Sequence, residues 1–193
     1  MKRVCVFCGS SMGVRPEYRH AAVDLGATCA GRGIEIVYGG GNVGLMGELA
    51  DAALAQGGRV VGVIPASLVA REVGHDRLTE LRVVRSMHER KAAMADLADG
   101  FIALPGGFGT LEEFCEILTW AQLGFHRKPC GLLNVAGYFD PLLDLFDRAV
   151  AEGFVGEPQR QMVLVERTID ELLARMGAYR SPVREPWLDD QAR

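Results

Sequence analysis

The chain has 193 residues, a net charge of −4 and 24 glycines, and about half of its residues are hydrophobic. This length and composition suit one domain whose core needs no disulfides. The chain has no basic run, which argues against nucleic-acid binding, and no stretch approaches the roughly 20 apolar residues of a membrane span. The five cysteines are odd in number and lie mostly in apolar runs, so we expect reduced core thiols in a cytoplasmic protein.

Short apolar runs alternate with helical patterns along the chain. We expect strands over residues 4–8, 34–38, 60–64, 81–84, 101–104, 131–134 and 162–165, and helices over 16–31, 43–56, 86–98, 110–124, 139–150 and 169–176. The polar, irregular stretch 65–80 is typical of an active-site loop. This alternation predicts a Rossmann-like, doubly wound parallel sheet, with three α/β/α layers. We expect a single domain over residues 1–177 and a loose tail over 178–193.

Glycine-rich segments follow three of these strands. They begin with Gly9 and Ser10, with Gly39-Gly40-Gly41, and with Pro105-Gly106-Gly107. Ligands of parallel α/β sheets bind outside the carboxyl ends of the strands, so the three segments are expected to meet at one edge. The third segment opens a helix, whose unpaired N–H groups and positive dipole end favour anions. The sequence therefore predicts a phosphate-binding site.

Residues 39–44 also satisfy the spacing G-x-G-x-x-G of a dinucleotide-binding turn. The acidic residue expected about 20 positions later, which would hold a ribose hydroxyl, is missing from residues 59–65. A nicotinamide-dependent oxidoreductase is therefore the weaker alternative. Two interpretations of this segment remain open, a tight turn with close helix packing and direct ligand contact through Gly40 and Gly41.

Glu113 lies one turn into the helix that follows the third glycine segment. A carboxylate beside a phosphate site weakens anion binding unless it performs chemistry, so we interpret Glu113 as catalytic. The alternative is a capping box, because Thr110 and Glu113 have its spacing. Glu112 and Glu116 share another face of the helix, where we expect them to be solvated.

Arg90 and Lys91 lie on the same helical stripe as three apolar residues, Met87, Met94 and Leu97. Most such charge pairs form a solvated surface. Two cations on an inward stripe are costly unless an anion meets them, so we expect both to contact a phosphate or a base edge.

The Cys5-x-x-Cys8 spacing suggests a metal or redox site, but the chain has no second cysteine pair and its four histidines lack ligand spacing. We interpret both thiols as core residues and expect neither a metal nor a cofactor.

At these residues the chain resembles the Lonely Guy family, the cytokinin riboside 5′-monophosphate phosphoribohydrolases. The resemblance spans roughly residues 3–175. It rests on Phe7-Cys8-Gly9-Ser10-Ser11, Tyr38-Gly39-Gly40-Gly41 with Gly44-Leu45-Met46-Gly47, Met87-His88-Glu89-Arg90-Lys91, Pro105-Gly106-Gly107-x-Gly109-Thr110-x-x-Glu113 and Thr119-Trp120-Ala121-Gln122-Leu123-Gly124. It implies a homodimer with Arg90 and Glu113 as catalytic residues. The implied nucleotide contacts are Glu72, Arg90, Lys91, Gly107, Phe108, Gly109, Thr110, Leu111, Glu112, Glu113 and Thr119, to which the loops and the stripe add Gly9, Ser10, Gly40, Gly41, Met87 and Gly106.

The function implied is metal-independent hydrolysis of the N-glycosidic bond of a nucleoside 5′-monophosphate, with release of the free base and ribose 5-phosphate. AMP and N6-prenylated AMP remain alternative substrates. The rival from another class is a carrier module of the molybdenum-cofactor type, which would bind without turnover. Some relatives carry the label lysine decarboxylase, but no lysine here stands in a pyridoxal-phosphate context.

Overall fold

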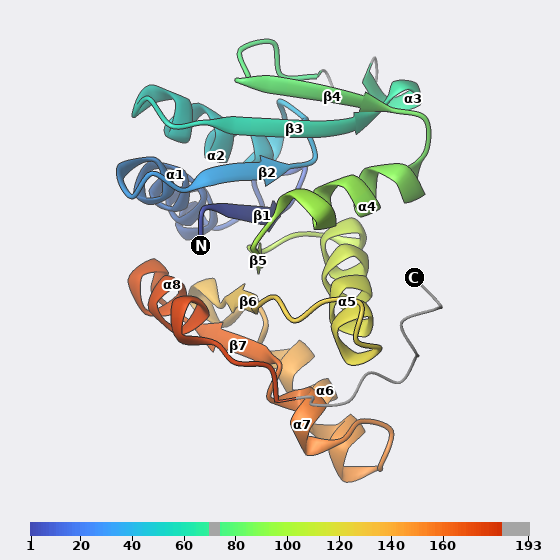
Figure 1. Ribbon diagram of the computed structural model, residues 1–193. Coiled ribbons are helices and arrows are strands. Elements are labelled where there is room, and N and C mark those ends of the chain that lie inside the picture. The colour runs from blue at the N-terminus through green and yellow to red at the C-terminus, as the bar shows by residue number, and fades with distance from the viewer. Residues whose placement is uncertain (70–73, 183–193) are drawn as a thin grey trace.

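The computed structural model describes residues 1–69 and 74–182. Within these ranges, seven parallel strands form one sheet in the order β4-β3-β2-β1-β5-β6-β7 (Figure 1). The strands are β1 (Arg3–Phe7), β2 (Glu35–Tyr38), β3 (Val60–Pro65), β4 (Glu80–Val84), β5 (Gly100–Ala103), β6 (Cys130–Leu133) and β7 (Val163–Glu166). The helices are α1 (Pro16–Gly31), α2 (Gly44–Ala55), α3 (Ala66–Val69), α4 (Met87–Leu97), α5 (Phe108–Gln122), the 3₁₀ turn η1 (Val135–Gly137), α6 (Asp140–Ala151), α7 (Glu157–Arg160) and α8 (Ile169–Ala178).

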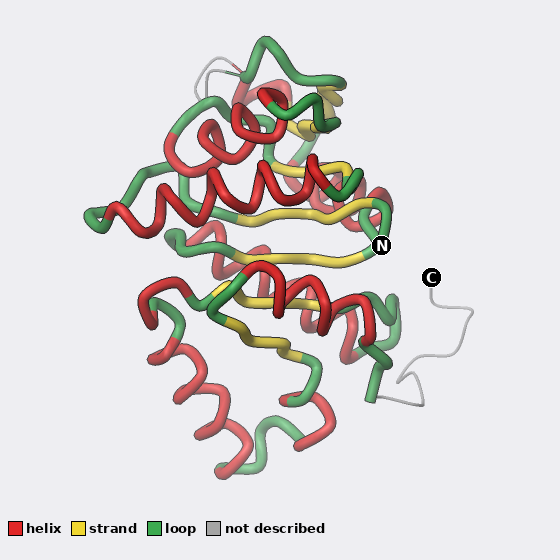
Figure 2. The backbone as a smooth tube through the Cα atoms, turned by 90° about the vertical axis from the view of Figure 1, so that its left-hand side faces the viewer, coloured by secondary structure: helices red, strands yellow, loops and turns green. Residues whose placement is uncertain are grey.

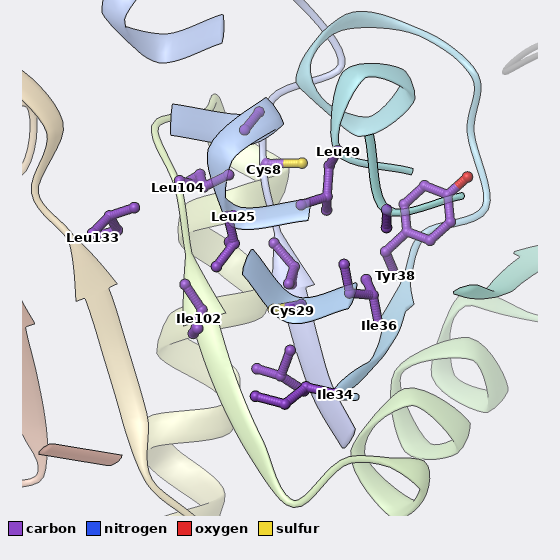
Figure 3. Packing of buried hydrophobic residues seen from close by; sticks show 14 of the residues in the cluster. Cys8, Leu25, Cys29, Ile34, Ile36, Tyr38, Leu49, Ile102, Leu104 and Leu133 are labelled. Atoms are coloured by element: carbon purple, nitrogen blue, oxygen red, sulfur yellow. The ribbon is translucent and has the colours of Figure 1, made fainter. Parts of the chain in front are cut away.

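The sheet is buried on both faces because its strands carry apolar side chains at odd and even positions alike. In β1, Val4 and Val6 belong to one core cluster, and Cys5 and Phe7 to the other. Helices α1, α2 and α8 pack on the first cluster, part of which appears in Figure 3. Helices α4, α5 and α6 cover the second, which gives the three layers visible in Figure 2. The predicted doubly wound α/β fold is confirmed.

Element boundaries agree with the sequence pattern to within about two residues. The predicted capping spacing at α4 is observed, since the Ser86 hydroxyl accepts the N–H of Glu89. The one-turn elements α3, η1 and α7 were not predicted, because a single turn carries no periodic signal. No helix in the described ranges combines the length and apolarity needed to span a bilayer. Most of the predicted tail, residues 183–193, lies outside the described residues.

The winding of the sheet reverses at β1. The chain adds β2, β3 and β4 on one side of β1 and then returns to place β5 on its other side (Figure 1). The loops after β1 and β5 therefore lead away in opposite senses and leave a crevice at the carboxyl ends of these two strands, where α/β proteins bind their ligands.

Candidate active site

A cavity of about 310 Å³ lies in this crevice. Four of its lining residues are predicted site residues, namely Gly9, Ser10, Gly106 and Gly107. The remainder of the lining comes from Ser11, Met12, Gly13, Tyr18, Leu45, Pro105 and Tyr138. The loops after β1 and β5 thus meet as predicted from their positions after two strands of one parallel sheet.

The two loops are held against each other by backbone contacts. The N–H of Gly9 donates to the Pro105 carbonyl at 3.1 Å. A side chain at Gly106 would overlap Thr110 and the backbone of Gly9, so only glycine permits this approach. The Tyr138 hydroxyl donates to the Gly106 carbonyl at 2.5 Å. The cavity floor is therefore fixed by its own loops.

Helix α5 begins at this cavity. Gly107 precedes it in an extended conformation, and among the described residues no side chain caps the helix there. Its first N–H groups therefore remain donors for an anion. Thr110 is 4% exposed and is the third residue of α5, so it is not the capping residue that precedes the helix. The capping-box alternative for Thr110 and Glu113 is therefore wrong, because α5 starts two residues earlier than the predicted helix.

Arg90 of α4 and Glu113 of α5 come together beside the crevice. Arg90 Nη2 lies 3.9 Å from Glu113 Oε1, and their side chains are only 8% and 14% exposed. Burial is the largest cause that raises the pKa values of the Cys5 and Cys8 thiols, and the Glu113 carboxylate is the second. That carboxylate therefore lies close to β1 and the loop that follows it. The predicted catalytic pair is therefore assembled from two helices on one face of the sheet.

The Arg90 guanidinium is held by neutral groups on its other sides. Nη2 donates to the Gly39 carbonyl at 3.4 Å, and Nη1 lies 3.8 Å from the sulfur of Met87. The Nε atom is buried and has no hydrogen-bond partner within the described part of the chain. A buried, unpaired donor of a cation is costly, so it marks a direction from which an acceptor is expected.

The glycine segment after β2, residues 39–41, contacts the Arg90 guanidinium through Gly39. A side chain at Gly39 would overlap the Arg90 guanidinium, and Gly40 has a φ of +77°, which favours glycine. The carbonyls of Gly40 and Gly41 accept hydrogen bonds from the His75 N–H and the Tyr38 hydroxyl. The tight-turn interpretation thus has a physical basis here, while ligand contact by Gly40 and Gly41 stays a prediction.

Lys91 points toward a different set of anions. Its ammonium lies 2.7 Å from Glu112 and 2.9 Å from Glu116, and its side chain is 12% exposed. Partial burial by itself lowers the pKa of Lys91, but the hydrogen bonds to the two carboxylates outweigh it and raise the pKa. Glu112 and Glu116 are 55% and 24% exposed, more than the 14% of Glu113, as predicted, and in addition they neutralise the cation of the neighbouring helix. Nucleotide contact by Lys91 stays a prediction.

The remaining predicted residues lie in other environments. Phe108 is 92% exposed at the start of α5, and Gly109 beside it has open surroundings. Leu111 packs its side chain against the second core cluster. Thr119 donates to the Cys115 carbonyl and lines a second cavity of about 160 Å³ between α5, α6, α7 and β7. Glu72 lies outside the described residues.

Known proteins share both the sequence and the fold of this chain. Residues 46–176 match the family model described as "Possible lysine decarboxylase". The cytokinin riboside 5′-monophosphate phosphoribohydrolase LOG of Oryza sativa subsp. japonica is 52% identical over 92% of this chain and 74% of its own length. LOG7 of Arabidopsis thaliana, which carries the same description, is 50% identical over 98% of this chain and 85% of its own length. The chain belongs to the Lonely Guy family.

Solved structures extend the likeness beyond the Lonely Guy family at the level of fold alone. The molybdenum cofactor binding protein of Rippkaea orientalis aligns with a TM-score of 0.70 at 22% identity, over 92% of this chain and 97% of that one. The molybdenum cofactor carrier protein of Chlamydomonas reinhardtii aligns with a TM-score of 0.68 at 20% identity, over 91% and 96%. At these identities the shared architecture says nothing of the ligand.

Four residues in and around this candidate site are not predicted from the sequence. Tyr18 and Tyr138 stack edge to face at 5.7 Å on the cavity wall. His75 is 1% exposed and contacts both the glycine segment after β2 and Asp51 of α2. None of the four belongs to a local motif, because their partners are distant in the sequence.

Proposed function

We propose that this chain hydrolyses the N-glycosidic bond of AMP or N6-prenylated AMP to the free base and ribose 5-phosphate. One observation carries the proposal, the approach of Arg90 and Glu113 beside the crevice where α5 begins. It joins a partly buried carboxylate and a buried cation to an anion-binding helix start. Relatives at about 50% identity are named for this activity on cytokinin riboside 5′-monophosphates.

The 5′-phosphate is assigned to the start of α5. Gly9, Ser10, Gly106 and Gly107 line the cavity there, and the first N–H groups of the helix follow Gly107 directly in the chain. Thr110 sits beneath this loop and fixes its shape through its contact with Gly106. A nucleoside without the phosphate forfeits these interactions, so the site selects monophosphates.

Glu113 is assigned as the base that activates water. Departure of the base leaves positive charge on the sugar, as in glycoside hydrolysis. The Glu113 carboxylate takes one proton from water, whose oxygen bonds to C1′ of the ribose. The C1′–N bond breaks, its electron pair leaves with the nucleobase, and the nucleobase takes up a proton. The negative charge of Glu113 also stabilises the oxocarbenium-like sugar.

Arg90 is assigned to the nucleotide and the leaving group. Its Nε is buried and has no hydrogen-bond partner among the described residues, and we assign it to an acceptor on the substrate. A cation there stabilises the negative charge that develops on the departing base. Met87, whose sulfur lies beside the guanidinium, offers an apolar surface to the base.

A decarboxylase that forms a Schiff base requires a lysine that can lose its proton. Lys91 lies close to this site, but Glu112 and Glu116 raise its pKa and hold it protonated. This favours a charge-neutralising role for Lys91 over a nucleophilic one.

We further propose a cytoplasmic homodimer. The five free thiols suit a reducing compartment. Val14, Phe108 and Phe154 are 97%, 92% and 85% exposed, which leaves apolar surface available to a second copy. Thr119 follows Glu113 by six residues, which is about 9 Å along the axis of α5. Nucleotide contact by Thr119 stays a prediction.

The test is a panel of purine nucleoside monophosphates incubated with the purified protein and scored for free base and ribose 5-phosphate. We expect release from AMP or N6-prenylated AMP, and we expect EDTA to leave the rate unchanged. Tight binding of a monophosphate without base release would support a carrier instead. Loss of turnover in EDTA, restored by a divalent ion, would overturn the metal-free mechanism.

A further inference from the structure

The three carbonyls of Gly39, Gly40 and Gly41 accept hydrogen bonds from three different residues. The Arg90 guanidinium donates to Gly39, the His75 backbone N–H to Gly40 at 3.0 Å, and the Tyr38 hydroxyl to Gly41 at 3.1 Å. The segment that supports Arg90 is therefore itself held in place by His75 and Tyr38.

His75 is anchored in turn by its ring. The backbone N–H of Arg77 donates to Nδ1 at 3.2 Å, so the ring proton of the neutral imidazole resides on Nε2. Nε2 lies 3.0 Å from Asp51 Oδ1 and donates to it. The ring is fully buried, whereas the Asp51 carboxylate is half-exposed and also accepts from the Arg77 side chain at 2.5 Å.

Asp51 and the glycine segment belong to one continuous stretch of chain, because α2 begins at Gly44. The ring of His75 therefore hydrogen-bonds to Asp51 of α2, while its backbone N–H hydrogen-bonds to Gly40. The adjacent Gly74 forms a backbone bridge with Gly41. A segment with three successive glycines has little stiffness of its own. Its shape depends on these contacts.

We propose that the Asp51–His75 pair is a positioning device for Arg90, acting through the carbonyls of Gly39 and Gly40. This proposal rests on the proposed function, in which Arg90 contacts the substrate and His75 does not. Loss of the His75 ring frees the glycine segment, and the Gly39 carbonyl then no longer fixes the Arg90 guanidinium. A small misplacement of such a group costs rate more than ground-state binding.

His126 offers a matched control. Its Nδ1 also accepts the backbone N–H of the residue two positions later, at 3.2 Å, and its Nε2 lies 3.0 Å from the Ile117 carbonyl. The same local arrangement thus occurs at the far end of α5, where it contacts neither Arg90 nor the glycine segment in the described structure. His126→Ala removes the same ring and the same kind of bonds.

The first readout needs no turnover. We follow the Nε–H signal of Arg90 by nitrogen-15 NMR, assigned through its loss in Arg90→Lys. We expect His75→Ala to shift or broaden this signal, and His126→Ala to leave it in place. An Arg90 signal unchanged in His75→Ala would overturn the proposal.

The second readout is the division of the effect between kcat and KM for the monophosphate that turns over. We expect His75→Ala to lower kcat by about 10- to 100-fold with less than about a threefold change in KM. His75→Gln, whose amide can still donate to Asp51, should recover part of kcat. The positioning proposal would also be overturned if His75→Ala changed only KM. It would be overturned as well if His126→Ala lowered kcat as much as His75→Ala does. An Arg90 signal that responds to His75→Ala in a protein without hydrolase activity would retain the positioning role and reject the proposed function.

Discussion

Arg90 Nη2 lies 3.9 Å from Glu113 Oε1, within ion-pair distance but farther than a hydrogen bond. At this distance Nη2 does not donate to Oε1, whereas it does donate to the Gly39 carbonyl at 3.4 Å. Such a pair suits a site in which the substrate lies between a base, Glu113, and a cation, Arg90.

Glu113→Gln preserves size and hydrogen bonding but removes the base. We expect kcat to fall by about 100-fold or more, because the amide neither accepts the proton of water nor stabilises a cationic sugar. KM should hold or decrease, since a negative charge near the phosphate is lost. Steady-state kinetics with the preferred monophosphate measure both.

Glu152→Gln at the exposed end of α6 provides the control for this exchange. It should match the unmodified protein in kcat and KM. Near-normal turnover in Glu113→Gln would leave that residue a structural partner of Arg90 and remove the mechanism proposed for it.

The phosphate site predicts strong selectivity for nucleotides over nucleosides. Loss of the interactions at the start of α5 is expected to cost about 4 kcal/mol, roughly a thousandfold in kcat/KM between AMP and adenosine. Thr110→Ala should narrow this ratio, because the buried Thr110 side chain shapes the loop at Gly106. The ratio is obtained from parallel assays on the two substrates.

Thr168→Ala removes a side chain that caps α8 and is not among the residues that line the cavity at the start of α5. It should cost about 1 kcal/mol of stability and leave the selectivity ratio unchanged. Equal processing of AMP and adenosine by the unmodified protein would assign the glycine loop a structural role only.

Gly39→Ala tests the support of Arg90 directly. The added methyl group would overlap Arg90 Nη2, so either the guanidinium or the glycine segment must move. We expect kcat to fall by at least about tenfold while the protein still folds. Kinetics and thermal unfolding of the same preparation separate the two effects.

Gly177→Ala, in α8 with open space around it, is the matching glycine exchange. It should raise stability by about 0.5–1 kcal/mol and leave kcat unaltered. Full activity in Gly39→Ala would show that Arg90 does not need this carbonyl.

Much of this site is visible in the sequence because its parts are local. A buried strand, a glycine loop and a helix start place Gly106 and Glu113 within a few residues of one another, and the period of α4 turns Arg90 inward. The start of α5 was placed two residues too late, because Phe108 is exposed and Gly109 is a poor helix former, so neither continues the apolar pattern.

What periodicity does not provide is the choice of partners between elements. The pairing of Lys91 with Glu116 joins α4 to α5 across 25 positions, and that of His75 with Asp51 spans 24. Such contacts depend on how the helices pack over the sheet, and only the folded chain brings them together. The histidines consequently lacked any recognisable spacing in the sequence.

His126 predicts an acid-sensitive term in the stability of the fold. Burial, the largest influence, and the nearby Lys128 ammonium lower the pKa of His126 to about 4. The unfolded chain binds this proton near pH 6.5, so the term is fully present above that pH and is lost as the pH falls toward 4. Linkage gives about 1–3 kcal/mol for this loss. His126→Gln cannot titrate but can still donate to the Ile117 carbonyl, which His126 Nε2 contacts. Urea unfolding at pH 7 and pH 4.5 should therefore show a smaller decrease in His126→Gln than in the unmodified protein, and equal decreases would place the acid sensitivity elsewhere.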